Sequence, residues 1–383
     1  MGETGKTVRR GGRRGVLKAA AVGATGAAVL AAPNVSRAQT TTLRFQSTWP
    51  SRDIQQEFAQ DYVNRVNRMG GGRLRLDLLA AGAVVGAFQL LDAVSAGTLD
   101  GGHGVCAYWF GKNKAFSLFG TAPPWFGDAN QLLAWFYYGG GEALYNELMH
   151  DIVRANAVGF LACPIPTQPL GWFKQPIERA EQFRGLKYRT VGLAADLFAE
   201  LGAAVTSLPG GEVVPALERG VIDGAEFSNP TSDRIFGFPD VAKNYMIQSY
   251  HQRTECYEVL FNRPKFEALP AELQGVLRHS AEASSADMSW KVLERFPKDM
   301  AALAQSGVSV RPTPRPVLDA QLAAWNKVLE RLEGDNSSPA AGPFFKKVCD
   351  SQRDWCRRVG NFYLRYEAPA ALSFTHFFAR QGG

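Results

Sequence analysis

The chain has 383 residues, of which 46% are hydrophobic and 20% charged, ordinary values that exclude an extended disordered or fibrous protein. Its length suits two lobes better than one core. Seven of the 42 Lys and Arg residues and one of the 36 Asp and Glu residues lie within residues 1–38, so 35 of each remain and the rest of the chain is formally neutral. Because nucleic-acid binding needs a basic face on the folded domain, we expect no nucleic-acid partner.

Residues 1–38 have the three-part layout of an export signal. The twin-arginine pattern RRGVLK of residues 13–18 precedes an uncharged, Ala-rich stretch, and Ser36 and Ala38 offer the small residues that a signal peptidase reads. A membrane anchor needs about 20 strongly apolar residues, whereas this stretch is rich in Ala and Gly and contains Pro33. We therefore expect a twin-arginine signal peptide at residues 1–38 and a periplasmic mature protein.

The cysteines do not suggest a disulfide framework. Their number is odd, and Cys349 and Cys356 would lie about 10.5 Å apart along one helix, too far to bridge. No CxxC motif or Cys/His cluster indicates zinc. We interpret most of the five as small buried apolar residues. They are Cys106, Cys163, Cys256, Cys349 and Cys356.

The start of the mature chain has the pattern of a βαβ unit. Residues 43–46 look like a strand, and Ser51 is a candidate cap for a helix that runs to about Met69 with one apolar face. Three glycines end this helix. Residues 74–78 then alternate Leu with charged residues, as a strand does. Strand, helix and strand in this order predict a parallel pair.

Two later passages, residues 92–101 and 215–224, resemble one another. Each reads as a helix end followed by a glycine, Gly97 or Gly220, and a short turn into a strand. A glycine at this position suits the left-handed helix cap. The resemblance between the passages indicates two lobes of similar α/β construction.

The C-terminal part is predicted to be helical. It contains two apolar stripes on either side of a loop at residues 336–339, and such stripes usually mean core packing. These helices could brace both lobes or contact a second copy of the chain. The first stripe is Leu318, Leu322, Trp325, Val328, Leu329 and Leu332, and the second is Phe345, Val348, Cys349, Trp355, Val359 and Phe362.

The chain carries little sign of catalytic chemistry. None of its five His residues has metal-ligand spacing, and there is no GxSxG elbow, Walker loop or GxGxxG after a strand. We interpret residues 139–141, three glycines, as a junction between helices. The sequence therefore favours a binding protein over an enzyme, with an exported enzyme for small acids as the alternative.

Three segments in succession carry a family resemblance. They are TQPLGWF at residues 167–173, FRGLKYR at residues 183–189 and LERGVIDGAEF at residues 217–227. This succession resembles the periplasmic solute-binding proteins of TRAP transporters, the DctP-like family, and within it the branch that binds 2-oxo acids. The similarity extends over nearly the whole mature chain.

The resemblance implies an α/β protein with the two-lobed periplasmic-binding-protein fold, crossovers between the lobes and long C-terminal bracing helices. A small organic acid would lie in the interlobe cleft, and the TRAP membrane subunits would be partners. We expect lobe I at residues 39–166 and 255–294, and lobe II at 167–254 and 295–350. Residues 351–383 would form a C-terminal helix and tail with a homodimer contact.

Arg189 and Gln168 match ligand-binding positions of the family. A guanidinium offers a planar pair of donors that fits a carboxylate, so Arg189 is expected to bind the acid group. We expect Arg189→Ala to abolish binding and to leave the fold intact. The amide of Gln168 could bind both the ligand and a hard cation.

Glu226 and Phe227 match the pair that holds a metal ion in the 2-oxo-acid branch, by side chain and by backbone carbonyl. A cation would remove the repulsion between Glu226 and an anionic ligand. Gln252 stands where some relatives carry Glu and is a candidate for both ligand and metal binding. With one acid fewer, Na⁺, Ca²⁺ and no metal all remain open.

Aromatic residues are the remaining substrate-binding candidates. Tyr108 and Trp109 follow a predicted strand and are expected to wall the cleft from the other lobe, and Trp49 and Phe88 are further candidates. The leading hypothesis is a binding protein for a 2-oxo or 2-hydroxy monocarboxylate, with a bulky or aromatic tail as one form. A sugar acid or dicarboxylate in the same fold, and a sensor in place of a transporter as partner, are alternatives.

Overall fold

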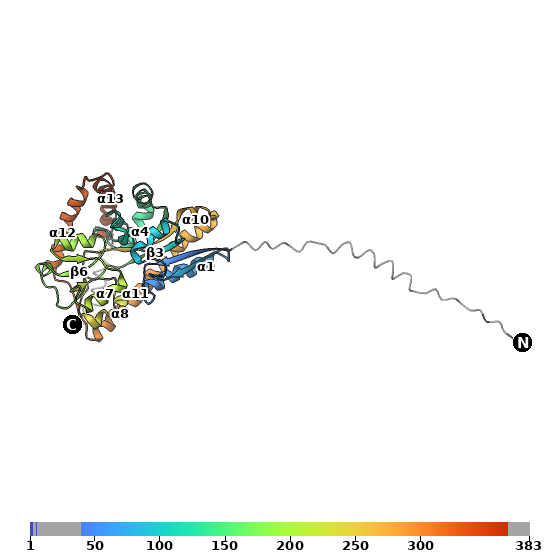
Figure 1. Ribbon diagram of the computed structural model, residues 1–383, viewed down its shortest axis with the longest axis horizontal. Helices are drawn as coiled ribbons and strands as arrows, with labels where there is room; N and C mark the ends of the chain where they lie inside the picture. The colour runs from blue at the N-terminus through green and yellow to red at the C-terminus, as the bar shows by residue number, and fades with distance from the viewer. Residues whose placement is uncertain (3–4, 6–39, 367–383) are drawn as a thin grey trace. The chain divides into compact units, whose positions relative to one another are not determined.

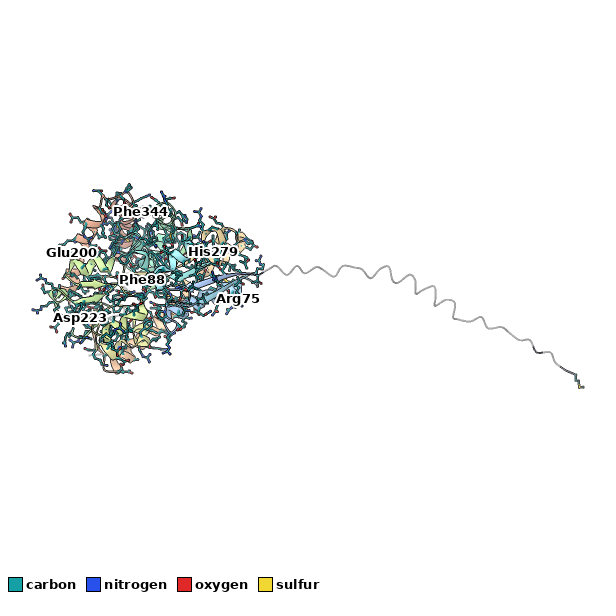
Figure 2. The ribbon with its side chains drawn as sticks, viewed as in Figure 1. Arg75, Phe88, Glu200, Asp223, His279 and Phe344 are labelled. Carbon is teal, nitrogen blue, oxygen red and sulfur yellow. The ribbon has the colours of Figure 1, made fainter. Side chains whose placement is uncertain are left out.

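The computed structural model describes residues 1, 2, 5 and 40–366 (Figure 1). Most of the predicted signal peptide, and residues 367–383 of the predicted tail, therefore lie outside the described residues. Residues 40–366 form an α/β protein with two separate sheets. Figure 2 adds the side chains that fill the space between the elements.

The first sheet, which defines lobe I, has five strands in the order β2-β1-β3-β10-β4. β1 pairs in parallel with β2 and β3, whereas β10 is antiparallel to both β3 and β4. The predicted βαβ unit is confirmed, but the helix is capped by Asp53 and not by Ser51. The strands are β1 Thr41–Ser47, β2 Leu74–Leu79, β3 Gly101–Gly104, β4 Ala157–Ile165 and β10 Glu255–Asn262.

The second sheet, which defines lobe II, has six strands in the order β11-β9-β5-β8-β6-β7. Neighbouring residues of β5 point to opposite faces, as a strand requires. Trp172 belongs to a hydrophobic cluster with Leu217, and Phe173 belongs to a separate cluster with Phe198. Both faces of this sheet are therefore buried. The strands are β5 Gly171–Phe173, β6 Lys187–Arg189, β7 Ala204–Thr206, β8 Gly224–Ala225, β9 Asn244–Met246 and β11 Ser309–Arg311.

Thirteen α-helices surround the sheets within the described residues. They are α1 Ile54–Met69, α2 Leu90–Ser95, α3 Phe116–Gly120, α4 Ala129–Tyr138, α5 Gly141–Asn146, α6 Leu193–Glu200, α7 Gly210–Glu218, α8 Pro230–Phe236, α9 Phe238–Val241, α10 Arg263–Glu267, α11 Ala271–Gln305, α12 Arg315–Glu333 and α13 Gly342–Tyr366. The shorter helical turns are η1 Ala87–Gln89, η2 Cys106–Trp109, η3 Glu147–Ile152 and η4 Ala180–Phe183. The junction between α4 and α5 contains the three predicted glycines, residues 139–141.

The chain crosses between the sheets three times. It passes from β4 of lobe I to β5 of lobe II, returns from β9 to β10, and reaches β11 of lobe II after α11. The 35-residue helix α11 packs on β4 and α1 in lobe I and on α8 and β11 in lobe II. In Figure 1 the labels β6, α7 and α8 lie to the left of α1, with α11 between them. The lobe boundaries drawn from the sequence stay a prediction.

The two repeated passages have the expected backbone. Gly97 follows α2 with φ 75° and Gly220 follows α7 with φ 71°, both in the left-handed region that favours glycine. Each turn leads into a strand, β3 or β8. The prediction of similar local construction in both lobes is confirmed.

The predicted C-terminal stripes are only partly buried. Leu322 is 38% exposed and Phe362 is 54% exposed, and the buried face of α12 includes Gln321 instead of Leu322. α12 packs on α6 and α13 packs on α12 and α5, so these helices do brace both lobes. None of the five cysteines, all within residues 40–366, forms a disulfide, and four are buried. In the described part of the chain no helix is long and apolar enough to cross a membrane.

Candidate functional site

The two lobes contact each other through polar side chains at the N-terminal ends of α1 and α8. The hydroxyl of Ser232 donates to the carboxylate of Asp53, and Gln55 Nε2 donates to Ser228 Oγ at 2.9 Å. The same Gln55 amide donates to the hydroxyl of Tyr257 at 2.8 Å. All of these groups are buried, so the lobes are closed on one another.

Arg189 lies at the end of β6 and is 1% exposed. Its Nε and Nη2 donate to the backbone oxygen of Leu208 at 3.0 and 2.8 Å. Its Nη1 donates to the backbone oxygen of Glu226 at 2.8 Å and to the carboxylate of Glu226 at 3.1 Å. The guanidinium has five N–H groups, so one on Nη2 is left over. Arg189 is thus held at the end of this strand by hydrogen bonds to two other segments.

Glu226 directly follows β8 and its side chain is fully buried. Burial raises the pKa of its carboxyl group, and the neighbouring Arg189 guanidinium opposes this rise. One oxygen, Oε1, pairs with Arg189, whereas Oε2 has no hydrogen-bond partner among the described residues. The ring of Phe227 lies against the Arg189 guanidinium at 5.7 Å. The two predicted metal-binding residues therefore contact the predicted carboxylate-binding residue.

Gln168, Gln252 and Glu255 form a second group beside this pair. Gln168 donates through Nε2 to Glu255 at 2.7 Å and through its backbone N–H to the carbonyl of Gln252 at 3.1 Å. Burial raises the pKa of Glu255 to about 8, and the charge of Glu226 contributes to that rise. The structure thus places Glu226 and Phe227 against Arg189 and joins Gln168 to the backbone of Gln252 and to Glu255.

Some of the buried polar atoms of this group have no hydrogen-bond partner among the described residues. Within the described chain, Gln168 Oε1, Glu226 Oε2 and both amide atoms of Gln252 are buried and have no hydrogen-bond partner. Buried polar groups in folded proteins are nearly always hydrogen-bonded, so such a cluster marks a place that a polar ligand or ion can satisfy. Carboxylate and amide oxygens are the donors that hard cations such as Na⁺ and Ca²⁺ prefer. The residues present therefore fit a cation.

The aromatic candidates lie on the lobe I side of the site. Trp49 donates to His103 Nδ1 at 2.8 Å, and its ring contacts Tyr108 and Tyr257. Burial lowers the pKa of His103 to about 3, so this imidazole is neutral and accepts the bond. Phe88 is half-buried and meets Tyr108 edge to face with ring centroids 4.8 Å apart.

Trp109 differs from the other aromatic candidates. Its indole N–H donates to the buried carboxylate of Glu258, which also accepts from Tyr145 at 2.7 Å. Its ring is 1% exposed, so most of it belongs to the core of lobe I. Tyr108 is the better wall residue, because the charges of Arg189, Glu255 and Glu226 all act on its hydroxyl.

Sequence reasoning missed Glu255 and Asp53. Glu255 is the first residue of β10, three residues after Gln252. An acid at the start of a strand was the signal in the sequence that could have pointed to it. Asp53 could not be predicted as a site residue, because its partner Ser232 lies 179 positions away in the sequence. Neither contact follows from a local pattern.

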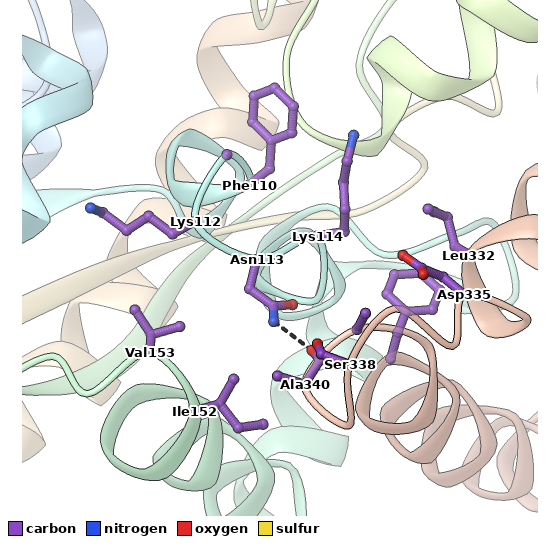
Figure 3. Close-up of a pocket in the computed structure, with 13 residues that line it drawn as sticks. Phe110, Lys112, Asn113, Lys114, Ile152, Val153, Leu332, Asp335, Ser338 and Ala340 are labelled. Atoms are coloured by element: carbon purple, nitrogen blue, oxygen red, sulfur yellow. Dashed lines mark hydrogen bonds between the residues drawn. The ribbon is translucent and has the colours of Figure 1, made fainter.

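A separate pocket contains none of the predicted site residues. It measures about 600 Å³ and lies between the loop 110–114, the end of η3 and the α12–α13 junction (Figure 3). Asn113 donates across it to the carbonyl of Ala340 at 2.7 Å. Lys114 pairs with Asp196 at 2.6 Å. This pocket shows no set of unpartnered buried groups comparable to that around Arg189.

The buried carboxyl of Asp53 leads to a prediction on stability. Burial raises its pKa to about 7, whereas an unfolded Asp titrates near 4. Between these values the folded state holds a proton that the unfolded state has lost, so stability falls by about 1.4 kcal/mol per pH unit as the pH rises. We expect Asp53→Asn to remove this part of the decline, measured by urea unfolding at pH 5, 6 and 7.

Asp233, with a pKa also raised to about 7 by burial, contributes a further decline in both proteins, so the variant is expected to keep part of the wild-type decline. Parallel stability profiles of the wild type and the variant would mean that Asp53 is ionised in the folded state.

Comparison with known proteins decides the family. The family model described as bacterial extracellular solute-binding protein, family 7, or DctP, matches residues 45–335. The chain belongs to the DctP family. A monocarboxylate 2-oxoacid-binding periplasmic protein of Nostoc sp. is 30% identical to it over 371 residues, which is 95% of this chain and 98% of the relative. The TRAP solute-binding-protein assignment made from the sequence is confirmed.

Solved structures of DctP-family proteins have the same two-lobed fold. A TRAP solute-binding protein of Bordetella bronchiseptica, a dimer with calcium and picolinate in one site, superposes with a TM-score of 0.84 at 26% identity, covering 89% of this chain and 99% of that one. A protein of Colwellia psychrerythraea with bound calcium and pyruvate gives a TM-score of 0.80 at 28% identity, covering 88% and 100%. A protein of Pseudoalteromonas atlantica with bound sodium and pyruvate gives 0.81 at 27% identity, covering 88% and 100%.

DctP-family proteins are periplasmic receptors that bind small acids and work with the membrane subunits of TRAP transporters. The predicted fold class, α/β with two lobes, is confirmed. A cation beside a small carboxylic acid occurs in these relatives, as the sequence-based cation hypothesis requires.

Proposed function

We propose that this protein captures a 2-oxo or 2-hydroxy monocarboxylate between its lobes, with a bridging Na⁺ or Ca²⁺, and delivers it to TRAP membrane subunits. The observation that carries this proposal is the buried Arg189, which is paired with a Glu226 whose second carboxylate oxygen lacks a hydrogen-bond partner within the described chain. Arg189 would bind the carboxylate of the acid, because a guanidinium matches a carboxylate in shape and charge.

Glu226 would be the group that moves on ligand binding. Its carboxylate now occupies one donor of Arg189, so it competes with an incoming carboxylate for the same guanidinium. A cation held by Glu226 Oε2, Gln168 Oε1 and Gln252 Oε1 would draw Glu226 away from Arg189 and release that donor. The backbone carbonyl of Phe227 would be the remaining protein ligand of the cation.

The charges of the site support the cation. Glu226 already pairs with the single guanidinium of Arg189, so a monocarboxylate brings a negative charge that the protein does not balance. Glu255 also supplies the acid that Gln252 does not. The cation itself would supply positive charge and oxygen coordination, whereas the protein orients the acid and excludes water from it.

The relatives support the ligand class. The Nostoc relative is a 2-oxoacid-binding protein, and the two structures with pyruvate hold calcium or sodium with it. Picolinate in the Bordetella bronchiseptica protein is an aromatic acid. We therefore extend 2-oxo-acid binding to this chain, as a receptor and not as an enzyme.

A thermal-shift screen of the purified protein tests the proposal. We expect pyruvate and other 2-oxo monocarboxylates to raise the melting temperature, because a ligand at 100 times its Kd stabilises the native state by about 2.7 kcal/mol. Na⁺ or Ca²⁺ should increase this shift and a chelator in sodium-free buffer should reduce it. NMR of the recovered acid should show it unchanged.

The screen also covers the alternatives. No shift from any 2-oxo acid would contradict the proposal, and a larger shift from a sugar acid or a dicarboxylate would replace the ligand class. Chemical conversion of the acid would favour the enzyme reading. A pull-down with TRAP membrane subunits, as opposed to a sensor receptor, tests the partner.

We further propose export by the twin-arginine route and a homodimer through α13 and residues 367–383. The RRGVLK pattern supports the first, and the dimeric Bordetella bronchiseptica relative supports the second. Substitution of Arg13 and Arg14 by Lys should block export, and light scattering should give the mass of a dimer.

A further inference from the structure

Gly192 lies where the backbone of lobe II comes against lobe I. It ends the turn from β6 to α6, a helix that packs on β7 of the lobe II sheet. Its φ of 64° and ψ of -146° are close to the mirror image of an extended strand, a conformation that glycine adopts readily and residues with a side chain avoid. The backbone of this turn therefore favours glycine by itself.

The space beside Gly192 is filled by lobe I. A Cβ atom at this position would lie 2.9 Å from Ser117 Oγ, 3.1 Å from Ala107 Cβ and 3.5 Å from Thr121 Oγ1. These three residues are buried and belong to η2 and to α3 with its C-terminal cap, and α3 packs on β10 of the lobe I sheet. Carbon atoms in contact prefer a separation of about 3.5–4.0 Å, so two of the three distances are too short for a side chain.

Further contacts between α6 and lobe I surround Gly192. Leu193 and Leu197 of α6 are fully buried and belong to the same hydrophobic cluster as the core of lobe I. Asp196, on the same helix, pairs with Lys114 of lobe I at 2.6 Å. The N-terminal half of α6 is thus packed on lobe I, and at Gly192 this packing leaves no room for a side chain.

The segment that carries Gly192 also carries Arg189. Gly192 is three residues beyond Arg189, and the residues between them are bonded to the segment that follows β7. The Thr190 N–H donates to the carbonyl of Thr206 at 3.2 Å, and Ser207 Oγ donates to the carbonyl of Thr190 at 2.9 Å. Because the turn is fixed to the rest of lobe II in this way, moving Gly192 away from lobe I would move Arg189 with it.

We propose that the contact of Gly192 with Ala107 and Ser117, here called the closure contact, sets how closely the two lobes approach and thereby how tightly the protein holds its acid. Because the two sides of this contact belong to different lobes, a side chain at position 192 would overlap with lobe I only in the closed state. Its cost therefore lowers the fraction of closed protein and weakens binding. The proposal rests on the proposed function, since it assumes that the acid is enclosed between the lobes.

Isothermal titration of Gly192→Ala with pyruvate in the presence of Ca²⁺ tests this inference. We expect the variant to bind about tenfold more weakly than the wild type, because overpacking a close contact opposes closure. Small-angle X-ray scattering at saturating pyruvate should give the variant a larger radius of gyration than the wild type. Melting temperatures identify a variant that fails to fold, and Ser117→Cys, which puts a larger atom on the lobe I side of the closure contact, then replaces it.

Two other glycines of lobe II provide matched controls. Gly185 has a φ of 73°, but a Cβ atom there would have nothing within 4 Å, so Gly185→Ala introduces backbone strain without any overlap. A Cβ atom on Gly211 would lie 3.5 Å from Pro50 Cγ of lobe I, an ordinary contact distance, so Gly211→Ala adds a methyl group between the lobes without overlap. Both variants should bind pyruvate as the wild type does.

A rescue experiment separates overlap between the lobes from strain within the turn. Adding Ala107→Gly and Ser117→Gly to Gly192→Ala removes both short contacts and leaves the strained backbone unchanged. The combined variant should regain most of the lost affinity, measured against the Ala107→Gly and Ser117→Gly double variant as its reference.

The outcomes distinguish the closure contact from the proposed function. Equal affinities of Gly192→Ala and the wild type, a loss of the same size in Gly185→Ala, or no recovery in the combined variant would overturn the closure contact and leave the proposed function in place. Failure of the wild type to bind pyruvate or any other 2-oxo acid would overturn both.

Discussion

Replacing Arg189 by lysine is expected to weaken the binding of 2-oxo acids by about 100-fold. The guanidinium presents parallel donors to a carboxylate, whereas a lysine ammonium is a point charge without that geometry. A 100-fold loss corresponds to about 2.7 kcal/mol, within the range of one or two hydrogen bonds to a charged group. Isothermal titration with pyruvate in the presence of Ca²⁺ measures the change.

Lysine is preferred to alanine because the structure changes the expected effect on stability. From the sequence, Arg189→Ala was expected to leave the fold intact. The structure has Arg189 and Glu226 as a fully buried ion pair, with the Leu208 carbonyl as a further partner. Removing one member of such a pair destabilises a protein by about 3–5 kcal/mol, since the other charge stays buried. Loss of binding by the alanine variant could therefore reflect unfolding.

A matched control is Arg278→Lys. Arg278 also makes a two-pronged ion pair, with Glu142 at 2.7 and 2.8 Å, but takes no part in the site. We expect this variant to bind 2-oxo acids as the wild type does. Equal affinities of the Arg189→Lys variant and the control would remove the carboxylate role of Arg189.

The local features of this fold could be predicted from the sequence because short-range patterns determine them. The strand at residues 74–79 follows from alternation, and the turns at Gly97 and Gly220 follow from the need for a positive φ. Arg189 ends β6, and Glu226 directly follows β8. These positions bring both residues to one edge of the lobe II sheet.

The contacts that close the site could not be predicted in the same way. Gln55 meets Ser228 across 173 residues of sequence, and Gln168 meets Glu255 across 87. Both contacts depend on how two sheets are placed relative to each other, for which no local pattern carries information. The family resemblance supplied the residues around Arg189, but it gave no indication of Glu255.

The same limit explains the error at the C-terminal helices. Spacing alone put Leu322 in the apolar stripe of α12, yet Gln321 is the buried residue because its side chain oxygen accepts from the backbone of Tyr250 and from Ser249. A polar residue can be buried where it satisfies the hydrogen bonds of a neighbouring turn. Hydrophobic periodicity does not anticipate such a contact.

Replacing Glu226 by glutamine is expected to remove the cation dependence of acid binding. In the wild type, a chelator in sodium-free buffer should lower the affinity for pyruvate by about tenfold or more, because the unbalanced carboxylates then face the ligand. The variant loses one negative charge and one cation ligand. Its affinity should be lower than that of the wild type with Ca²⁺ and the same with and without chelator, as measured by titration in both buffers.

Glu258→Gln is the matched control, since Glu258 is equally buried and likewise has a pKa raised by burial. Its carboxylate accepts from Trp109, Tyr145 and Cys106 in the core of lobe I and not from any group around Arg189. The control should therefore keep the full response to Ca²⁺ even if its melting temperature changes. Should the Glu226 variant also keep that response, the cation must be held by other oxygens, and Glu226 would serve only to balance the charge of Arg189.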